Sequence, residues 1–231
     1  MNESLSTYTG LAGSGELAAQ RHRVLRNTYW LLALSMVPTV LGAWVGVAMN
    51  INSLISPVAG LFVFMGGAFA FMFAIEKTKD SAAGVGVLLA FTFFMGLMLA
   101  RLLSIVLGLR NGPSLVMTAF GGTGLVFLAM ATLASAIKRD LSGMGKFLFV
   151  GALVIMAAGI INVFVQSGAA FLTMAVLCIA LFSAYMVYDL KRVIDGGETN
   201  YITATLELYL DLYNVFQSLL SLLGIFGGDS D

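Results

Sequence analysis

Seven long apolar runs alternate with short polar connections along the chain. They cover residues 28–49, 54–75, 82–107, 113–137, 145–166, 168–188 and 201–226. Each run is long enough to cross a bilayer, because a membrane-spanning helix needs about 20 residues. Pro57 and Pro113 stand at the first turn of the second and fourth runs, where a missing N–H costs nothing. The pattern predicts an all-α integral membrane protein with seven transmembrane helices.

Two polar segments flank this membrane domain, which we place at residues 28–226. Residues 1–27 are rich in Gly, Ser and Ala and become basic at Arg21, Arg23 and Arg26. We expect them to form a disordered polar tail whose basic end meets the membrane. Residues 227–231 form a short C-terminal tail.

Composition and charge agree with a membrane protein. The chain has 231 residues, of which 59% are hydrophobic and 10% charged, more apolar than a soluble domain of this size. Twelve basic and twelve acidic residues balance, so nothing indicates nucleic-acid binding. In the seven-span arrangement only Arg101 and Arg110, of the twelve Lys and Arg, fall on the side opposite the N-terminus. The positive-inside rule therefore places the N-terminus in the cytoplasm and the C-terminus outside.

Candidate catalytic residues are scarce. The chain has one cysteine, Cys178 in an apolar run, and one histidine, His22 in a basic stretch. The sequence contains no Ser/His/Asp set, paired-histidine metal motif or nucleotide-binding loop. We therefore expect a protein that is not an enzyme and holds no cofactor.

Polar residues recur every three or four positions in the last apolar run, which places them on one stripe of a helix. They are Thr203, Glu207, Asp211, Asn214, Ser218 and Ser221. A carboxylate at bilayer depth is expensive and is tolerated only against partners or water. We expect this stripe to face the bundle interior, with Asp211 at its centre.

Asp189 is the second carboxyl of interest, and its position allows two interpretations. It ends the sixth run, whereas Asp211 lies roughly 15 Å along the seventh, at 1.5 Å per residue. Asp189 is either an interfacial carboxylate beside Lys191 and Arg192 or, if it is drawn inward, a partner of Asp211. Arg101 could neutralise these acids, but we favour its reaching the outer headgroups.

Small residues are spread through several runs in pairs that would let helices approach closely. They are Gly42 with Gly46, Gly66 with Ala70 and Ala74, and Gly121 with Gly122 and Gly124. We expect them to mark tight contacts between helices.

Several motifs resemble those of one family. Tyr188-Asp189-Leu190 and the segment 208–216 are similar to the closing motifs of the Bax inhibitor family, also called transmembrane Bax inhibitor motif proteins. The segment 138–142 resembles the loop between that family's fourth and fifth spans. The segments 196–201 and 25–29 resemble its YccA-like bacterial branch, and the resemblance extends from Arg23 to Phe226.

The resemblance implies a seven-helix bundle in a bacterial inner membrane, with the last helix at its centre. It also implies that Asp189 and Asp211 form a hydrogen-bonded latch that opens and closes a calcium-conducting path with pH. Family members with this activity carry an arginine near the end of the second span, where this chain has Lys77 and Lys79. Either lysine could replace it as the basic partner, or the latch differs, because lysine cannot form a two-pronged bond.

Three classes of function follow. The first is a pH-sensitive leak for calcium or another cation, with Asp189, Asp211, Glu207 and Asn214 along the path. Asp189 and Asp211 would be transient calcium ligands, since calcium prefers oxygen atoms, and two carboxyl groups in contact would share one proton. The second class, implied by the YccA-like branch, is a regulator of a membrane-anchored AAA protease. We expect the protease to bind residues 1–27 of this chain. The third is a purely structural membrane protein.

Overall fold

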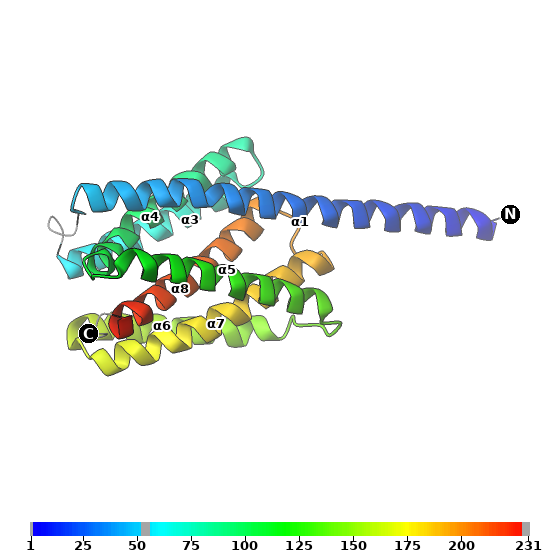
Figure 1. The fold of residues 1–231 in the computed structure, drawn as a ribbon. Coiled ribbons are helices and arrows are strands. Elements are labelled where there is room, and N and C mark those ends of the chain that lie inside the picture. Colours follow the sequence, from blue (N-terminus) through cyan, green and yellow to red (C-terminus); the bar gives the residue numbers. More distant parts are fainter. Residues whose placement is uncertain (1, 52–55, 228–231) are drawn as a thin grey trace.

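In a computed structural model that describes residues 2–51 and 56–227, with side chains from Leu17 onward, the described residues form seven long helices (Figure 1). The helices are α1 (Asn2–Ala48), α3 (Pro57–Thr78), α4 (Ala82–Leu107), α5 (Gly112–Ala136), α6 (Met144–Val165), α7 (Gly168–Asp195) and α8 (Tyr201–Gly227). All seven are long and apolar enough to cross a membrane, and the described residues contain no strand. The predicted fold class is confirmed.

The helices run back and forth, so the first helix, α1, begins at one end of the bundle and the last helix, α8, ends at the other (Figure 1). We call the end that carries the α3–α4 turn (79–81) and the α7–α8 loop (196–200) the loop end. The N-terminal part of α1 extends past the loop end, clear of the other helices (Figure 1).

Two helices are longer than the apolar runs indicate. α1 begins at Asn2, so the expectation of a disordered segment over residues 1–27 is wrong for the described part. Extending an existing helix costs far less than starting one, and the residues from Leu17 to Arg21 are good helix formers. α7 continues beyond Tyr188 to Asp195 and ends at Gly196, whose φ of 82° is the left-handed conformation that glycine adopts readily.

The last helix, α8, is the centre of the bundle, as the resemblance implied. It packs against α7, α5, α1, α4 and α3. Tyr209, Asp211 and Ser221 point in different directions around α8, and all are buried. α6 lies outside, against α7, with Phe147 among its exposed apolar residues. The outer helices thus present their apolar side chains to lipid.

Glycines allow a close approach of α1 to α4 but do not do so everywhere we expected. A Cβ at Gly42 would overlap the carbonyl oxygen of Phe93, and one at Gly96 would overlap that of Thr39. Gly46 likewise faces Ala100. By contrast, a Cβ at Gly66, Gly121 or Gly124 would meet no described protein atom within 4 Å. The expectation of tight packing is confirmed for the Gly42 pair and wrong for these three, which face outward.

Tyrosines fix the rotation of α8 about its axis. The Tyr209 hydroxyl lies 2.8 Å from Thr39 Oγ1 on α1 and 3.4 Å from the Thr92 carbonyl on α4. One turn further, the Tyr213 hydroxyl donates to the Met95 carbonyl at 3.2 Å. Because these tyrosines lie opposite Asp211 on the helix, their bonds turn Asp211 toward α7.

Candidate functional site

Asp189 and Asp211 form a buried pair between α7 and α8. Their side chains are within hydrogen-bonding contact of each other, and the two residues are only 5% and 3% exposed. Because α7 continues to Asp195, Asp189 lies six residues inside the helix, about 9 Å from its end. Of the two interpretations of Asp189, the structure places it as the partner of Asp211 rather than as an interfacial carboxylate.

The chemistry of this contact requires a proton. A carboxylate only accepts hydrogen bonds, so two carboxyl groups can bond to each other only when one is protonated. Asp211 Oδ2 is buried and has no hydrogen-bond donor among the described residues. With one shared proton the pair ties α7 to α8, and without it two negative charges lie in contact and repel.

Arg192 is the basic residue that meets this pair. Its Nη1 atom lies 2.9 Å from Glu207 Oε1 on α8 and 3.6 Å from Asp189 Oδ1 on its own helix. Its Nη2 atom lies 3.4 Å from Glu198 Oε2 in the α7–α8 loop, and the guanidinium lies over the ring of Tyr188. One guanidinium therefore joins α7, α8 and the loop between them.

Arg192 was not among the site residues predicted from the sequence, because we took it for an interfacial charge beyond the end of the sixth span. One feature of the sequence could have identified Arg192. It follows Asp189 by three residues, which places both side chains on one face if the helix continues. Neighbouring Lys191 points elsewhere and pairs with Asp195 at 2.7 Å.

The structure corrects the expectation that Lys77 or Lys79 is the basic partner. Lys79 Nζ lies 2.6 Å from Glu76 Oε1 in an exposed pair. Lys77 Nζ lies 5.5 Å from the ring centre of Phe73 on its own helix. Both residues stand at the end of α3, which packs mainly on α4 and touches α8 only slightly. Their side chains therefore stay at the outside of the bundle.

The remaining residues of the polar stripe continue from the pair along α8. Glu207, half-buried, lies one turn nearer the loop end, and its Oε2 atom is buried without a described partner. Asn214 Nδ2 donates to the Leu210 carbonyl at 2.7 Å, and Ser218 and Ser221 are buried. Among the described residues no three His, Cys, Asp or Glu side chains group to hold a metal ion.

Asn200 caps α8 at the loop end. Its Oδ1 atom accepts the backbone N–H groups of Ile202 and Thr203 at 2.9 and 3.3 Å. Such caps satisfy N–H groups that have no partner within the helix. Glu198 Oε1 accepts the N–H of Asn200 at 2.7 Å, which fixes the loop before the cap.

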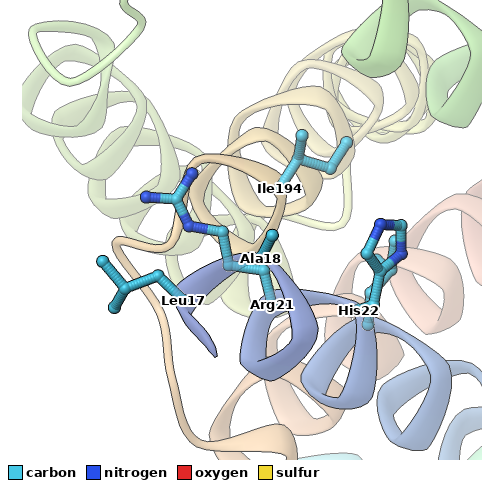
Figure 2. Close-up of a pocket in the computed structure, with 6 residues that line it drawn as sticks. Leu17, Ala18, Arg21, His22 and Ile194 are labelled. Carbon is cyan, nitrogen blue, oxygen red and sulfur yellow. The ribbon is translucent and has the colours of Figure 1, made fainter. Parts of the chain in front are cut away.

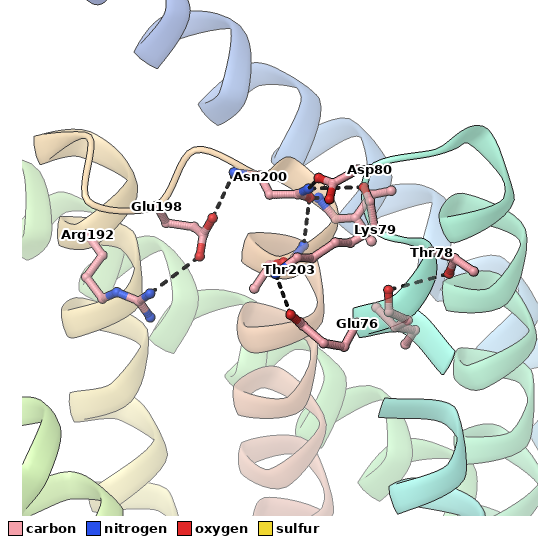
Figure 3. Close-up of polar contacts among 10 residues, drawn as sticks. Glu76, Thr78, Lys79, Asp80, Arg192, Glu198, Asn200 and Thr203 are labelled. Carbon is pink, nitrogen blue, oxygen red and sulfur yellow. Dashed lines mark hydrogen bonds and ion pairs between the residues drawn. The ribbon is translucent and has the colours of Figure 1, made fainter. Parts of the chain in front are cut away.

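The same asparagine connects this loop to the α3–α4 turn. Asn200 Nδ2 donates to the Lys79 carbonyl and to Asp80 Oδ1, both at 3.0 Å (Figure 3). Since Glu198 also pairs with Arg192 (Figure 3), polar contacts run from the acid pair to the surface of the loop end. These contacts connect the acid pair to the surface of the loop end.

A seven-helix membrane bundle with a buried acid pair is the class of protein that the fold and the site define. The family model described as inhibitor of apoptosis-promoting Bax1 matches residues 21–228. The chain belongs to the Bax inhibitor family.

Bacterial relatives match nearly the whole chain. A membrane protein of Vibrio cholerae is 35% identical over 97% of this chain and 98% of its own. The modulator of FtsH protease YccA of Escherichia coli K12 is 36% identical over 90% of this chain and 92% of its own. The inner membrane protein YccA of Escherichia coli O6:H1 matches to the same extent.

Removing the Arg192 guanidinium should destabilise the bundle, because Asp189, Glu207 and Glu198 would lose their cation. Hydrogen bonds to charged groups contribute about 1.5–3 kcal/mol each, and part of this is lost here to solvent exposure. We expect Arg192→Gln to lower the melting temperature of the purified protein by roughly 3–10 °C.

Lys191→Gln is the matched control for this experiment, since it removes the same charge from the adjacent position. Lys191 is itself buried, but its partner Asp195 is half exposed, so we expect the loss of this single pair to cost less than the loss of Arg192, which serves three acids. Equal losses in the two variants would show that Arg192 does not hold the site together.

Proposed function

We propose that the protein is a proton-gated cation leak of the bacterial inner membrane, with calcium as the candidate ion. The observation that carries this proposal is the Asp189–Asp211 contact, in which two helices present carboxyl groups to each other inside a membrane domain. Carboxyl groups at such depth are costly, and they commonly mark ion or proton pathways. A purely structural role would be met at lower cost by apolar packing.

The gate works through the shared proton. While the proton is present, the pair holds α7 against α8 in a closed state, and the burial of both residues supports this assignment. When the proton is lost, the two charges repel and the helices separate. The freed oxygen atoms are hard ligands of the kind calcium prefers. Glu207 and Asn214 extend the polar stripe to either side of the pair, so an ion would pass them before and after the gate.

The direction of the pH dependence follows from this order of events. Flux through the protein in liposomes should be low in acid and should rise with pH, by about tenfold per pH unit while a single proton controls the state. Asp211→Asn keeps a neutral, hydrogen-bonding side chain at every pH, so the path should remain closed and the flux should lose most of its pH dependence. Asp189→Asn should behave similarly.

Asp195→Asn provides the control, because Asp195 lies on the same helix but pairs with Lys191 at the surface. This variant should retain the pH profile of the wild-type protein. Glu207→Gln should change the conductance more than the midpoint of the profile. A wild-type profile in Asp211→Asn would contradict the gate.

A second function, modulation of a membrane-anchored AAA protease, is favoured by α1 and by a relative. The stretch from Asn2 to Gln20 is helical and spans about 28 Å, and α1 stands clear of the bundle beyond the loop end (Figure 1). A relative with 36% identity is named a modulator of FtsH protease. The positive-inside rule places this helix in the cytoplasm, within reach of a soluble ATPase domain. The two functions are compatible in one protein.

Deleting residues 2–20 should weaken co-purification with the protease, because it removes the helix that projects from the bundle. Insertion into the membrane should be unaffected, since the apolar part of α1 begins at Thr28. Removal of residues 228–231, at the opposite end of the chain, is the control and should leave binding unchanged. Full binding by the 2–20 deletion would move the contact to the membrane spans and rule out this role of the helix.

A further inference from the structure

A cavity of about 430 Å³ lies between α1 and the end of α7, away from the acid pair. Its lining consists of Leu17, Ala18, Arg21, His22, Leu25 and Ile194 (Figure 2). A smaller cavity of about 60 Å³ shares Leu17 and Arg21 and reaches Gly196 and Glu198 in the α7–α8 loop. The larger volume is within the range of small-molecule sites, about 300–1,000 Å³.

The lining of this cavity is amphipathic. Four of its six residues are apolar, and the other two, Arg21 and His22, supply nitrogen donors. Arg21 lies against Gly196 at the end of α7, and no ion pair of Arg21 occurs among the described contacts. The acid of the smaller cavity, Glu198, is already engaged by Arg192 and by the N–H of Asn200. The lining therefore favours an anion that carries an apolar portion.

The position of the apolar run in α1 places the cavity at the headgroup layer. Arg21 precedes the apolar run of α1, which begins at Thr28, by seven residues, or about 10 Å. Ile194 follows Asp189 by five residues, or about 8 Å, so the α7 side of the cavity lies between the acid pair and the loop end. Headgroups account for the difference between a hydrocarbon core of about 30 Å and a bilayer of about 40–45 Å. The cavity thus begins at the headgroup layer.

Other side chains support this depth. Trp30 is 73% exposed at the start of the apolar run, the position of the aromatic belt in membrane proteins. Leu25 is the lining residue of α1 nearest the hydrocarbon, three residues or about 5 Å before Thr28. The apolar side of the cavity therefore faces the acyl chains, and Arg21 lies at the level of the phosphates or just beyond.

We propose that this cavity binds the headgroup of an anionic phospholipid. Arg21 and His22 donate to the phosphodiester, while Leu25 and Ile194 contact the glycerol and the first acyl carbons. Basic pockets between transmembrane helices are known headgroup sites, and the planar guanidinium suits phosphate oxygens. A zwitterionic lipid brings a cation close to Arg21 and fits less well. A bound lipid would tie α1 to α7, because both helices line the cavity.

Phosphatidylglycerol is a suitable probe. The full-length protein would be placed in nanodiscs of phosphatidylcholine with a minor fraction of phosphatidylglycerol, and retained lipids would be counted by native mass spectrometry. We expect the wild-type protein to retain phosphatidylglycerol preferentially. Arg21→Gln should reduce this preference about five- to tenfold, since charge-assisted hydrogen bonds are the strong ones. Arg21→Lys should give an intermediate value, and His22→Gln a smaller loss.

Arg23→Gln is the matched control, because Arg23 has the same charge on the same helix but does not line the cavity. It should leave the preference unchanged. Equal losses in Arg21→Gln and Arg23→Gln would mean general attraction to a basic helix and would overturn the site. Displacement of the lipid by inorganic phosphate alone would also overturn it, as would a wild-type protein with no preference. The melting temperature of each variant checks that the bundle remains folded.

Discussion

Carboxyl groups inside a membrane must be neutralised, and the rest of this structure depends on how that is done. In the gate we propose, one proton shared by Asp189 and Asp211 and one guanidinium, that of Arg192, serve the buried acids between α7 and α8. Both devices join two helices rather than one. In this proposal, the groups that neutralise the buried charges also join α7 to α8.

The surrounding packing keeps these groups in register. α8 is enclosed by five helices, and its tyrosines fix its rotation through bonds to α1 and α4. α5, which packs against both α7 and α8, contributes no ionisable side chain. The groups that face the pair include Arg192, Glu207 and the hydroxyl of Tyr185, whereas the Tyr188 hydroxyl lies against Gly145 on α6. Arg192 contacts the pair through Asp189 and contacts the α7–α8 loop through Glu198, so it connects the pair to that loop.

Much of the fold could be predicted because membrane spans have a simple signature. Uninterrupted apolar runs gave all seven helices, and the spacing of Glu207, Asp211 and Asn214 indicated a polar stripe on the last one. The end of α7 could not be predicted in the same way. In the sequence, Lys191 and Arg192 look like charges at the membrane surface. In the structure, Lys191 pairs with Asp195 and Arg192 with Asp189, and the helix continues to Asp195.

The basic partner of the acid pair, Arg192, lies in the part of α7 that was not predicted. Lysines near the end of α3 were the natural candidates by position, but only the packing of α3 on α4 reveals that they face outward. Gly66 and Gly121 illustrate the same difficulty, because a small residue permits close packing without requiring a neighbour. Local pattern determines the helices, whereas the faces that meet are decided by the whole bundle.

Infrared difference spectroscopy of the carboxylic acid C=O stretch tests the shared proton most directly. As the pH is raised, the wild-type protein should lose the signal of one protonated carboxyl group in a hydrogen-bonded environment. The double variant Asp189→Asn with Asp211→Asn should lack that signal throughout. If the band and its pH dependence persisted in the double variant, the proton would reside elsewhere and the Asp189–Asp211 contact would not be the gate.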